Sequence, residues 1–595
     1  MRNFLGSLMG SLTALVIFFT GLCFVGLVML IAMASAGKQD HTTSVRDGSY
    51  LHFQLDTNIT DAPSQMEFGD LAGKPQESLQ LRSAVAALES ASADKRIAGL
   101  VLTGSLQADG YGSSFAALRE LRAAIAAFRK AGKPVIAYLN DADTRDYYLA
   151  SAASDVALDP YGMIVMPGLA ARPTFYAGAF EKFGVGVQYT RVGKYKSAIE
   201  PFTRKDLSPE NREQLATLLG DLWTNLLGEI SESRGLSVKD LQSVADNEAL
   251  LSAEAALRLK LIDRVLYRDQ LIDELKKKTG VSSAKESFKQ VSMVDYMKAT
   301  DSGSASGGRI ALVYAEGTIV DGEGERGEIG GVTFSRELRR LRQDDDVKAI
   351  VLRVNSPGGS ASASEMIQRE LRLAREVKPV VVSMGGYAAS GGYWISAYST
   401  RIFAEPTTIT GSIGVFGLFF DVEKLAGNLG LSFDTVKTAR HADVFTLTRP
   451  KTDAELQIIQ KHVDWIYDQF VGKVAEARKL DVAAVREIAQ GRVWSGSSAL
   501  RLGLVDELGG LEAAIAHAGK LAKLGDKPSV VEYPRKKELA ELLADLFGKF
   551  DSVQVREPGI ADRLSQRLQR EYALINSCND PHGIYARLPV DLVIE

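Results

Sequence analysis

The sequence predicts an α/β protein built from two tandem copies of one domain with mainly parallel sheets, preceded by a single membrane-spanning helix. Three observations support this fold class. A long apolar run lies near the N-terminus, three sequence blocks occur twice in the same order, and β-branched runs alternate with helical stretches within each copy. A chain of 595 residues is long enough for several domains.

The apolar run predicts a membrane anchor. Residues 12–34 read LTALVIFFTGLCFVGLVMLIAMA, and no charged residue occurs between positions 4 and 36. This run exceeds the ~7–15 apolar residues of a cleaved signal peptide and reaches the ~20 that cross a bilayer. Because Arg2 and the α-amino group precede the run, we expect residues 1–11 in the cytoplasm. The rest of the chain would then lie in the periplasm, with the anchor in a bacterial inner membrane.

The repeated blocks keep a nearly constant spacing, with offsets that drift from 250 to 246 to 243 residues. The matched pairs are Ile97–Gly110 with Val347–Ser360, Tyr147–Pro160 with Tyr393–Pro406, and Ser252–Val265 with Ser495–Leu508. We therefore predict a first repeat over residues 50–298, a polar linker at 299–309, a second repeat at 310–526, and a tail at 527–595 that contains an amphipathic helix.

Composition excludes several function classes. The 70 basic and 74 acidic residues leave a net charge of −4, which does not indicate nucleic-acid binding. Two cysteines, one of them inside the apolar run, do not indicate a disulfide framework. No metal-binding motif such as H-E-x-x-H occurs in the sequence, and we expect neither a metal nor another cofactor.

Serines and glycines in the second repeat suggest acyl-transfer chemistry. Gly358 and Gly359 follow a predicted strand, where backbone amides can form an oxyanion hole, although an ordinary turn is an equal interpretation. Ser356 and Ser390 lie in turns that we interpret as structural. Ser412, in TITGSIGV, follows an apolar run on a tight segment and is the better candidate nucleophile, although a lone G-S-x-G is weak evidence.

A serine nucleophile needs a base, and the six histidines are poor candidates. Only His441 remains a candidate base, and nothing in the sequence supplies it with an orienting carboxylate. A buried lysine with a lowered pKa can serve instead. When the repeats are aligned, Lys196 of the first copy faces Ala442, and Ser412 of the second faces Met166. This complementarity predicts an active site shared by the two copies.

Two other interpretations of Lys196 stay open at this point. One is plain divergence between two structural repeats, which would leave Lys196 as a solvated surface residue. Lys194, two residues earlier, is the alternative base if the segment is extended.

The segments TGSIGVFG, NSPGG, ASGGYWIS and GKYKSAIEPF together resemble the long, two-domain form of bacterial signal peptide peptidase A. The resemblance runs from the apolar N-terminal run to about residue 525. It implies a membrane-anchored serine protease with a Ser–Lys dyad, a ClpP/crotonase-like fold and a bowl-shaped homotetramer. Its expected substrates are extended apolar peptides such as signal-peptide remnants.

The resemblance also implies roles for individual residues. Ser412 would be the nucleophile and Lys196 the general base, with oxyanion donors at Gly358 or Gly359 and at Ile413. A hydroxyl near the lysine amine is also expected, for which Thr435 and Thr438 are the candidates. The alternatives from other classes are a non-catalytic membrane scaffold and a crotonase-like acyl-CoA enzyme.

Overall fold

The structure is a computed structural model, and it describes residues 45–63, 78–300, 308–325, 327–525, 528–534 and 583–588, with Phe18 and Gly21. The predicted anchor at 12–34 and the predicted amphipathic helix of the tail lie outside these residues. Within the part of the chain that the structure describes, no helix is long and apolar enough to cross a membrane.

The first half folds around a sheet in which every neighbouring pair of strands is parallel. Its strands, in spatial order, are β10 (Arg264–Val265), β6 (Asp155–Leu158), β5 (Val135–Leu139), β4 (Ile97–Thr103), β1 (Ser49–Gln54) and β11 (Gln290–Ser292). Apolar runs such as IAGLVLT, in which five of the seven residues are buried, are typical of strands covered on both faces. Two hydrophobic clusters, one on each face, confirm this cover.

Helices account for most of the rest of the first half. They are α2 (Leu81–Ala93), α3 (Phe115–Lys130), α4 (Thr144–Ala150), α5 (Ala177–Phe183), α6 (Glu200–Thr203), α7 (Pro209–Arg234), α8 (Val238–Asn247), α9 (Ala253–Arg258), α10 (Arg268–Thr279) and α11 (Met293–Thr300). Two short strand pairs, β2 (Asn58–Thr60) with β3 (Ser78–Gln80) and β7 (Met163–Val165) with β9 (Leu250–Ser252), flank the main sheet.

The second half repeats this plan. Its sheet runs β21 (Val493–Ser495), β19 (Ile409–Gly411), β17 (Val380–Ala389), β15 (Val347–Ser356), β12 (Arg309–Glu316) and β23 (Ser529–Tyr533), while β18 (Arg401–Ala404) pairs with β17 and β22 (Glu507–Leu508). All pairs except β19–β21 are parallel. The predicted α/β tandem duplication is therefore confirmed. Strand β23 lies beside β12 as β11 lies beside β1, which extends the second repeat's sheet beyond residue 526.

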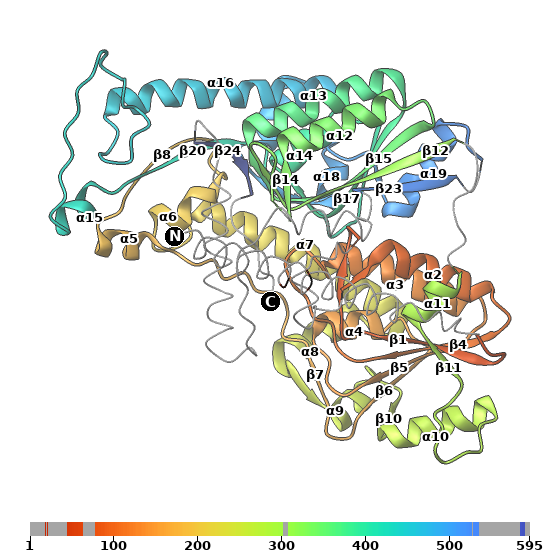
Figure 1. The fold of residues 1–595 in the computed structure, drawn as a ribbon. Coiled ribbons are helices and arrows are strands. Elements are labelled where there is room, and N and C mark those ends of the chain that lie inside the picture. The colour runs from red at the N-terminus through yellow and green to blue at the C-terminus, as the bar shows by residue number, and fades with distance from the viewer. Residues whose placement is uncertain are drawn as a thin grey trace, which may run out of the picture.

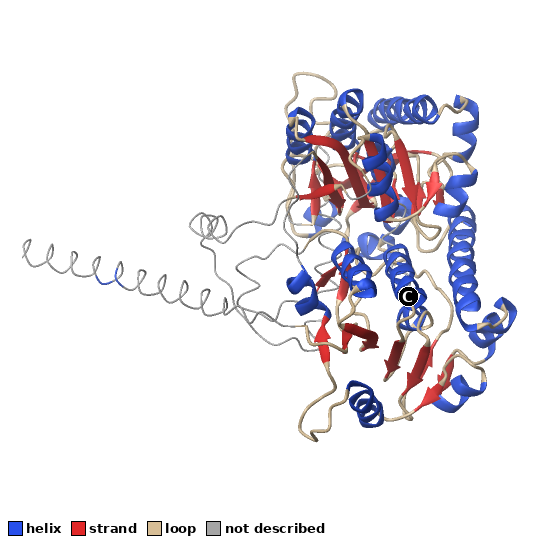
Figure 2. Cartoon of the chain, turned by 90° about the vertical axis from the view of Figure 1, so that its right-hand side faces the viewer, coloured by secondary structure: helices blue, strands red, loops and turns tan. Residues whose placement is uncertain are grey.

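The helices of the second half are α12 (Gly331–Gln343), α13 (Ala361–Val377), α14 (Gly391–Ser396), α15 (Glu423–Asn428), α16 (Asp453–Arg478), α17 (Val482–Ile488), α18 (Gly496–Arg501) and α19 (Leu511–Leu521). Helix α19 covers one face of the sheet, and α12, α13 and α16 contribute to the core on the other. Figure 2 shows the strands of the two repeats as two groups, one above the other, each with its own helices.

A third, mixed sheet joins the repeats. Its order is β14 (Glu328–Gly330), β13 (Thr318–Val320), β16 (Gly358–Ser360), β24 (Ile584–Arg587), β20 (Val415–Asp421) and β8 (Gly186–Val192). Strand β8 comes from the first half and pairs antiparallel with β20 of the second, from Val415 opposite Val192 to Asp421 opposite Gly186. Figure 1 shows β8 and β20 running side by side below α16. This pairing brings the segment after β8 next to the segment before β20.

Buried ion pairs also cross between the repeats. The Arg353 side chain on β15 is fully buried, and its guanidinium donates to Asp61 and Glu120 of the first half at 2.8 and 2.7 Å. Arg119 on α3 forms an ion pair with Glu405 of the second half. These contacts join the two repeats into one body.

Candidate active site

The structure brings Lys196 and Ser412 together, as the comparison of the repeats predicts, and it adds a second serine. The Lys196 amine lies 3.0 Å from Ser412 Oγ and 2.7 Å from Ser390 Oγ. It also donates to the Ser412 carbonyl at 3.1 Å. All three side chains are fully buried. Lys196 comes from the first repeat and both serines come from the second, so the site exists only where the repeats meet.

The backbone around Lys196 is fixed by residues of the second repeat. The Tyr195 amide donates to the Gln490 carbonyl at 3.0 Å. Gly491 has φ +77°, and a Cβ built on it would stand 2.6 Å from the Cβ of Lys196. Only glycine combines this backbone conformation with so close an approach. The lysine is therefore held on both sides, by β8 before it and by the 490–491 turn beside it.

Burial sets the protonation state of Lys196. The pKa of its amine lies well below the ordinary value, because removal from water disfavours the ammonium form. The residues that follow it pack in an apolar cluster of Ala198, Ile199, Phe202, Phe416, Leu418 and Tyr585. The partners of the amine are hydroxyl and carbonyl oxygens, which stabilise an ammonium less than a carboxylate would. A neutral lysine can accept a proton from a neighbouring hydroxyl.

The two serines have different backbone settings. Ser390 stands at the turn from β17 into α14 with φ +56° and ψ −111°, a conformation that is rare for any residue with a side chain. Such strained strand-to-helix turns present a nucleophile in many hydrolases. Ser412 has φ +50° between β19 and β20. The Ser390 amide donates to the Gly411 carbonyl at 2.8 Å, so the two turns are tied to each other.

Glycines let a third turn approach Ser390. Gly358 has φ +94°, and a Cβ built on it would stand 2.6 Å from the amide nitrogen of Gly391. The Gly358 amide itself donates to Ser356 Oγ at 3.2 Å, so the predicted oxyanion donor at 358 already has a partner. The alternative amides are those of Gly391, which follows Ser390 in the chain, and of Gly359, which follows Gly358. Ile413 is buried in the core of the second repeat, and its carbonyl accepts from the Gly491 amide at 2.8 Å.

The hydroxyl predicted near the lysine is not one of the two threonines. Thr435 and Thr438 are exposed on the segment between α15 and α16, whereas the lysine amine contacts Ser390 and Ser412. That segment contains no strand in the structure, so its alignment with the first repeat does not translate into spatial proximity. The alternative base Lys194 is exposed, with its amine 5.1 Å from the centre of the Tyr195 ring.

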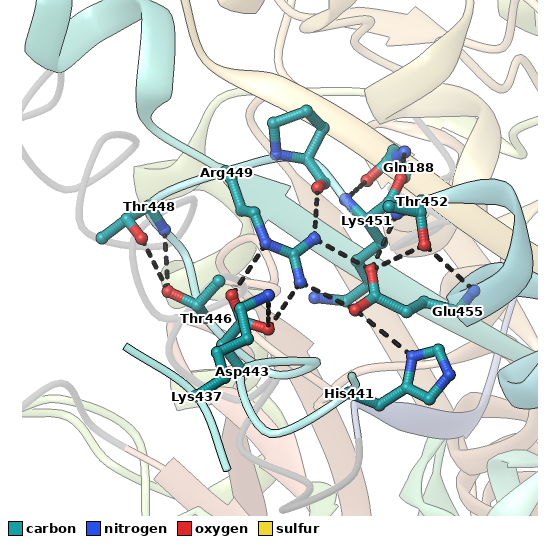
Figure 3. A network of polar contacts seen from close by, with 11 residues as sticks. Gln188, Lys437, His441, Asp443, Thr446, Thr448, Arg449, Lys451, Thr452 and Glu455 are labelled. Carbon is teal, nitrogen blue, oxygen red and sulfur yellow. Dashed lines mark hydrogen bonds and ion pairs between the residues drawn. The ribbon is translucent and has the colours of Figure 1, made fainter. Parts of the chain in front are cut away.

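His441 does have a carboxylate neighbour, contrary to the sequence-based interpretation. Its Nδ1 lies 3.7 Å from Glu455 Oε1, in the polar network of Figure 3. Arg449 holds this network together through Asp443 and Glu455 at the start of α16. Gln188 of β8 exchanges two hydrogen bonds with the backbone of residue 451, at 2.6 and 2.8 Å. The network fastens β8 to α16, and so braces the strand that leads to Lys196.

Comparison with known proteins places this architecture in a family. The family model of peptidase family S49 matches residues 127–282 and 372–525, more than half of the chain. This chain belongs to peptidase family S49. Lys196 lies in the first matched region, and Ser390 and Ser412 lie in the second. The family makes the chain a serine protease, which displaces the scaffold and acyl-CoA alternatives.

Two relatives of known name align with most of the chain, and a third aligns with part of it. "Protease 4" of Salmonella typhi is 35% identical over 96% of this chain and 94% of that protein. "Serine protease SPPA, chloroplastic" of Arabidopsis thaliana is 33% identical over 88% of this chain and 76% of that protein. "Putative signal peptide peptidase SppA" of Enterococcus faecium is 36% identical over 38% of this chain and 68% of that protein. The resemblance to signal peptide peptidase A is thus confirmed.

Proposed function

We propose that this S49 protease is a membrane-anchored endopeptidase that cleaves extended apolar peptides with a Ser–Lys pair, in which Lys196 is the general base. The observation that carries the proposal is the buried Lys196 amine within 3.0 Å of two serine hydroxyls. An amine in this setting is neutral at a pH where a solvated lysine is charged.

Of the two serines, Ser390 suits the role of nucleophile better than Ser412, which the sequence analysis favours. Its hydroxyl is the nearer to the amine, at 2.7 against 3.0 Å. It occupies the strained turn directly before Gly391, and Gly358 closely approaches the residues on both sides of it. Ser412, which contacts the lysine through its hydroxyl and its carbonyl, then positions the amine toward Ser390.

The reaction follows from these positions. Ser390 Oγ attacks the peptide carbonyl carbon while Lys196 takes the hydroxyl proton. The amides of Gly359 and Gly391 stabilise the charge that develops on the carbonyl oxygen. The Lys196 ammonium then protonates the leaving amine as the C–N bond breaks. A water molecule, deprotonated by the same lysine, releases the acyl group from Ser390.

The proposed membrane anchor suggests which class of substrate the protease meets. The apolar run at 12–34 would anchor the chain in a bacterial inner membrane, with the catalytic body in the periplasm. There, apolar signal-peptide remnants would be held at a high local concentration. A ClpP/crotonase-like fold for each repeat and a homotetrameric assembly complete this proposal. It is consistent with the signal peptide peptidase name of the Enterococcus faecium relative.

The test compares Ser390→Ala, Ser412→Ala and Lys196→Ala with the wild type. Activity would be measured on a fluorogenic apolar peptide, and the residue modified by a fluorophosphonate would be identified by mass spectrometry. We expect Ser390→Ala to lose about 10³-fold or more in kcat and to lose the adduct. Ser412→Ala should keep the adduct on Ser390 and lose about 10–100-fold. An adduct on Ser412, with Ser390→Ala still active, would return the nucleophile to Ser412.

A further inference from the structure

The chain's own C-terminal region supplies a strand to the mixed sheet at the active site. Strand β24 lies between β16 and β20 and is antiparallel to both. Gly359 is opposite Ala586 on one side, and Phe416 is opposite Tyr585 on the other. In Figure 1, β24 is labelled directly beside β20 and β8. We refer to residues 583–588 as the C-terminal strand segment.

The two strands that flank this segment also flank the catalytic groups. Strand β16 contains Gly358 and Gly359, and β20 begins three residues after Ser412. An extended peptide between two such strands gains main-chain hydrogen bonds from both. In the structure the C-terminal strand segment pairs with both strands in this way.

The carbonyl of Ala586 lies close to Gly391, the residue that follows Ser390. A Cβ built on Gly358 would stand 2.2 Å from the Ala586 oxygen, and one built on Gly391 would stand 3.0 Å from it. The Leu588 amide donates to the Pro357 carbonyl at 2.7 Å. Since bonded pairs alternate along an antiparallel ladder, Ala586 and Gly359 form the next bonded pair. The carbonyl oxygen of Ala586 therefore lies close to Gly391, which follows Ser390. It also lies close to Gly358 and Gly359, which precede Ser360.

The side chains of the segment are buried as those of a bound ligand would be. Ile584, Tyr585, Ala586 and Leu588 are between 0 and 3% exposed. Ile584 and Ala586 join the core of the second repeat, whereas Tyr585 packs in the apolar cluster next to Lys196, 5.7 Å from the Phe416 ring. Ala586 is fully buried, so its surroundings enclose a small side chain at this position.

We propose that the C-terminal strand segment is an intramolecular substrate mimic, which occupies the peptide groove with the Ala586–Arg587 bond at Ser390 and so holds the protease in a self-inhibited state. The inference rests on the proposed function. It adds that substrates bind antiparallel to β16 and β20, with a small residue before the cleaved bond. Covalent attachment gives the segment an effective concentration of roughly millimolar, which a free peptide must outcompete.

The geometry also explains how the segment inhibits without being consumed. If Ser390 Oγ bonds to the Ala586 carbonyl carbon, the bond from that carbon to the Arg587 nitrogen breaks, and the Lys196 ammonium protonates the Arg587 amine. The Leu588–Pro357 hydrogen bond keeps that amine in the groove. Return of its proton to Lys196 lets the amine displace Ser390 and restores the peptide bond.

The test uses the full chain in detergent. Ile584→Asp and Ala586→Asp place a charge in a buried position and should expel the segment, whereas Ile584→Val should retain it and serves as the matched control. We expect kcat/KM on a fluorogenic peptide to rise about tenfold or more in the Asp variants and to stay within about twofold in Ile584→Val. The synthetic peptide GIYARL should inhibit Ile584→Asp competitively, and a scrambled peptide should not.

A second measurement separates this inference from the proposed function. Hydrogen exchange of residues 358–360 and 415–421 would be followed in Ser390→Ala, with and without Ile584→Asp. Faster exchange with Ile584→Asp supports groove occupation even if no peptide is cleaved. Active enzyme with unchanged kcat/KM and unchanged exchange would overturn the inference. Wild-type protein that has lost residues 587–595 would also overturn it, because the segment would then be a substrate that is consumed. Circular dichroism checks that each variant is folded.

Discussion

At the scale of single residues, the chemistry depends on how one amine is buried. The Lys196 side chain is fully buried and its amine contacts hydroxyl and carbonyl oxygens, so burial lowers its pKa. A group that is neutral when folded and charged when unfolded lowers stability at neutral pH. The unfolded chain binds more protons there, so the free energy of unfolding rises as the pH rises toward the ordinary lysine value. Lys196, the proposed general base, is thus expected to lower the stability of the fold.

Replacement of Lys196 tests both its proposed role as the base and its expected effect on stability. Lys196→Met keeps the shape of the side chain and removes the amine, so kcat should fall about 10³-fold or more while the melting temperature at pH 7 rises. Lys196→Arg is the matched control, because a guanidinium stays charged and should lower the melting temperature. In the wild type, kcat/KM should rise with pH through an apparent pKa well below ~10.4. A melting temperature that falls in Lys196→Met would show that the lysine is charged in the fold.

The sequence reveals Lys196 only because the repeats can be aligned, since a lysine among many carries no signal of its own. Ser390 is missed, because Ser-Gly-Gly at a helix start resembles a close-packing turn. The signal that identifies it is the end of a buried strand directly before the serine, which is the setting of a nucleophile turn. The aligned repeats also place Thr144 of the first copy opposite Ser390, the same kind of difference that singles out Lys196.

At the scale of elements, the site is made by strand pairing between the halves. The parallel sheet of each repeat can be predicted from its own hydrophobic pattern, because neighbouring βαβ units pair locally. The mixed sheet cannot be predicted in this way. Its strands β8, β20 and β24 come from the first repeat, the second repeat and the tail, and short strands carry no pattern that specifies a distant partner.

Two glycines test how the turn beside β21 positions the lysine. Gly491 and Gly430 share φ +77°, but a Cβ would meet Lys196 at 2.6 Å only at Gly491, and nothing within 4 Å at Gly430. Each Ala substitution should cost about 1 kcal/mol of stability for the backbone conformation. Gly491→Ala should also displace the amine and lower kcat about 10–100-fold, whereas Gly430→Ala should leave kcat unchanged. Equal kcat values in the two variants would show that the turn does not position Lys196.

At the scale of the whole molecule, the halves meet through buried charges. Arg353 forms ion pairs with both Asp61 and Glu120, and further carboxylates lie close by. The pKa of Glu316 is raised to about 7, first by burial and then by the charge of Asp61. The pKa of Glu405 is also raised to about 7, by burial and by the charge of Glu120. More buried acids than bases at this interface make the contact between the repeats sensitive to pH.

This excess of acid predicts a pH dependence with a definite sign. A carboxyl whose pKa is higher in the folded than in the unfolded chain stabilises the fold below ~4.3, and this contribution is lost as the pH rises through about 7. Gln at position 316 stays neutral and can still accept the Ala62 amide bond that Glu316 Oε2 accepts at 3.1 Å. Glu316→Gln should therefore match the wild type at pH 4.5 and exceed it by about 1–3 kcal/mol at pH 8.

Chemical denaturation at several pH values would measure this difference. Exposed Glu325 supplies the control, since Glu325→Gln is the same substitution at a position outside the buried contact between the repeats. If the free energy of unfolding of Glu316→Gln differed from that of the wild type by the same amount at every pH, the charge of Arg353 would already compensate the Glu316 carboxylate. Because Lys196 and the serines come from opposite repeats, an interface weakened above pH 7 should also loosen the catalytic site. The wild-type pH–rate profile should then fall at alkaline pH, where Lys196 is fully neutral, and that fall should be smaller in Glu316→Gln.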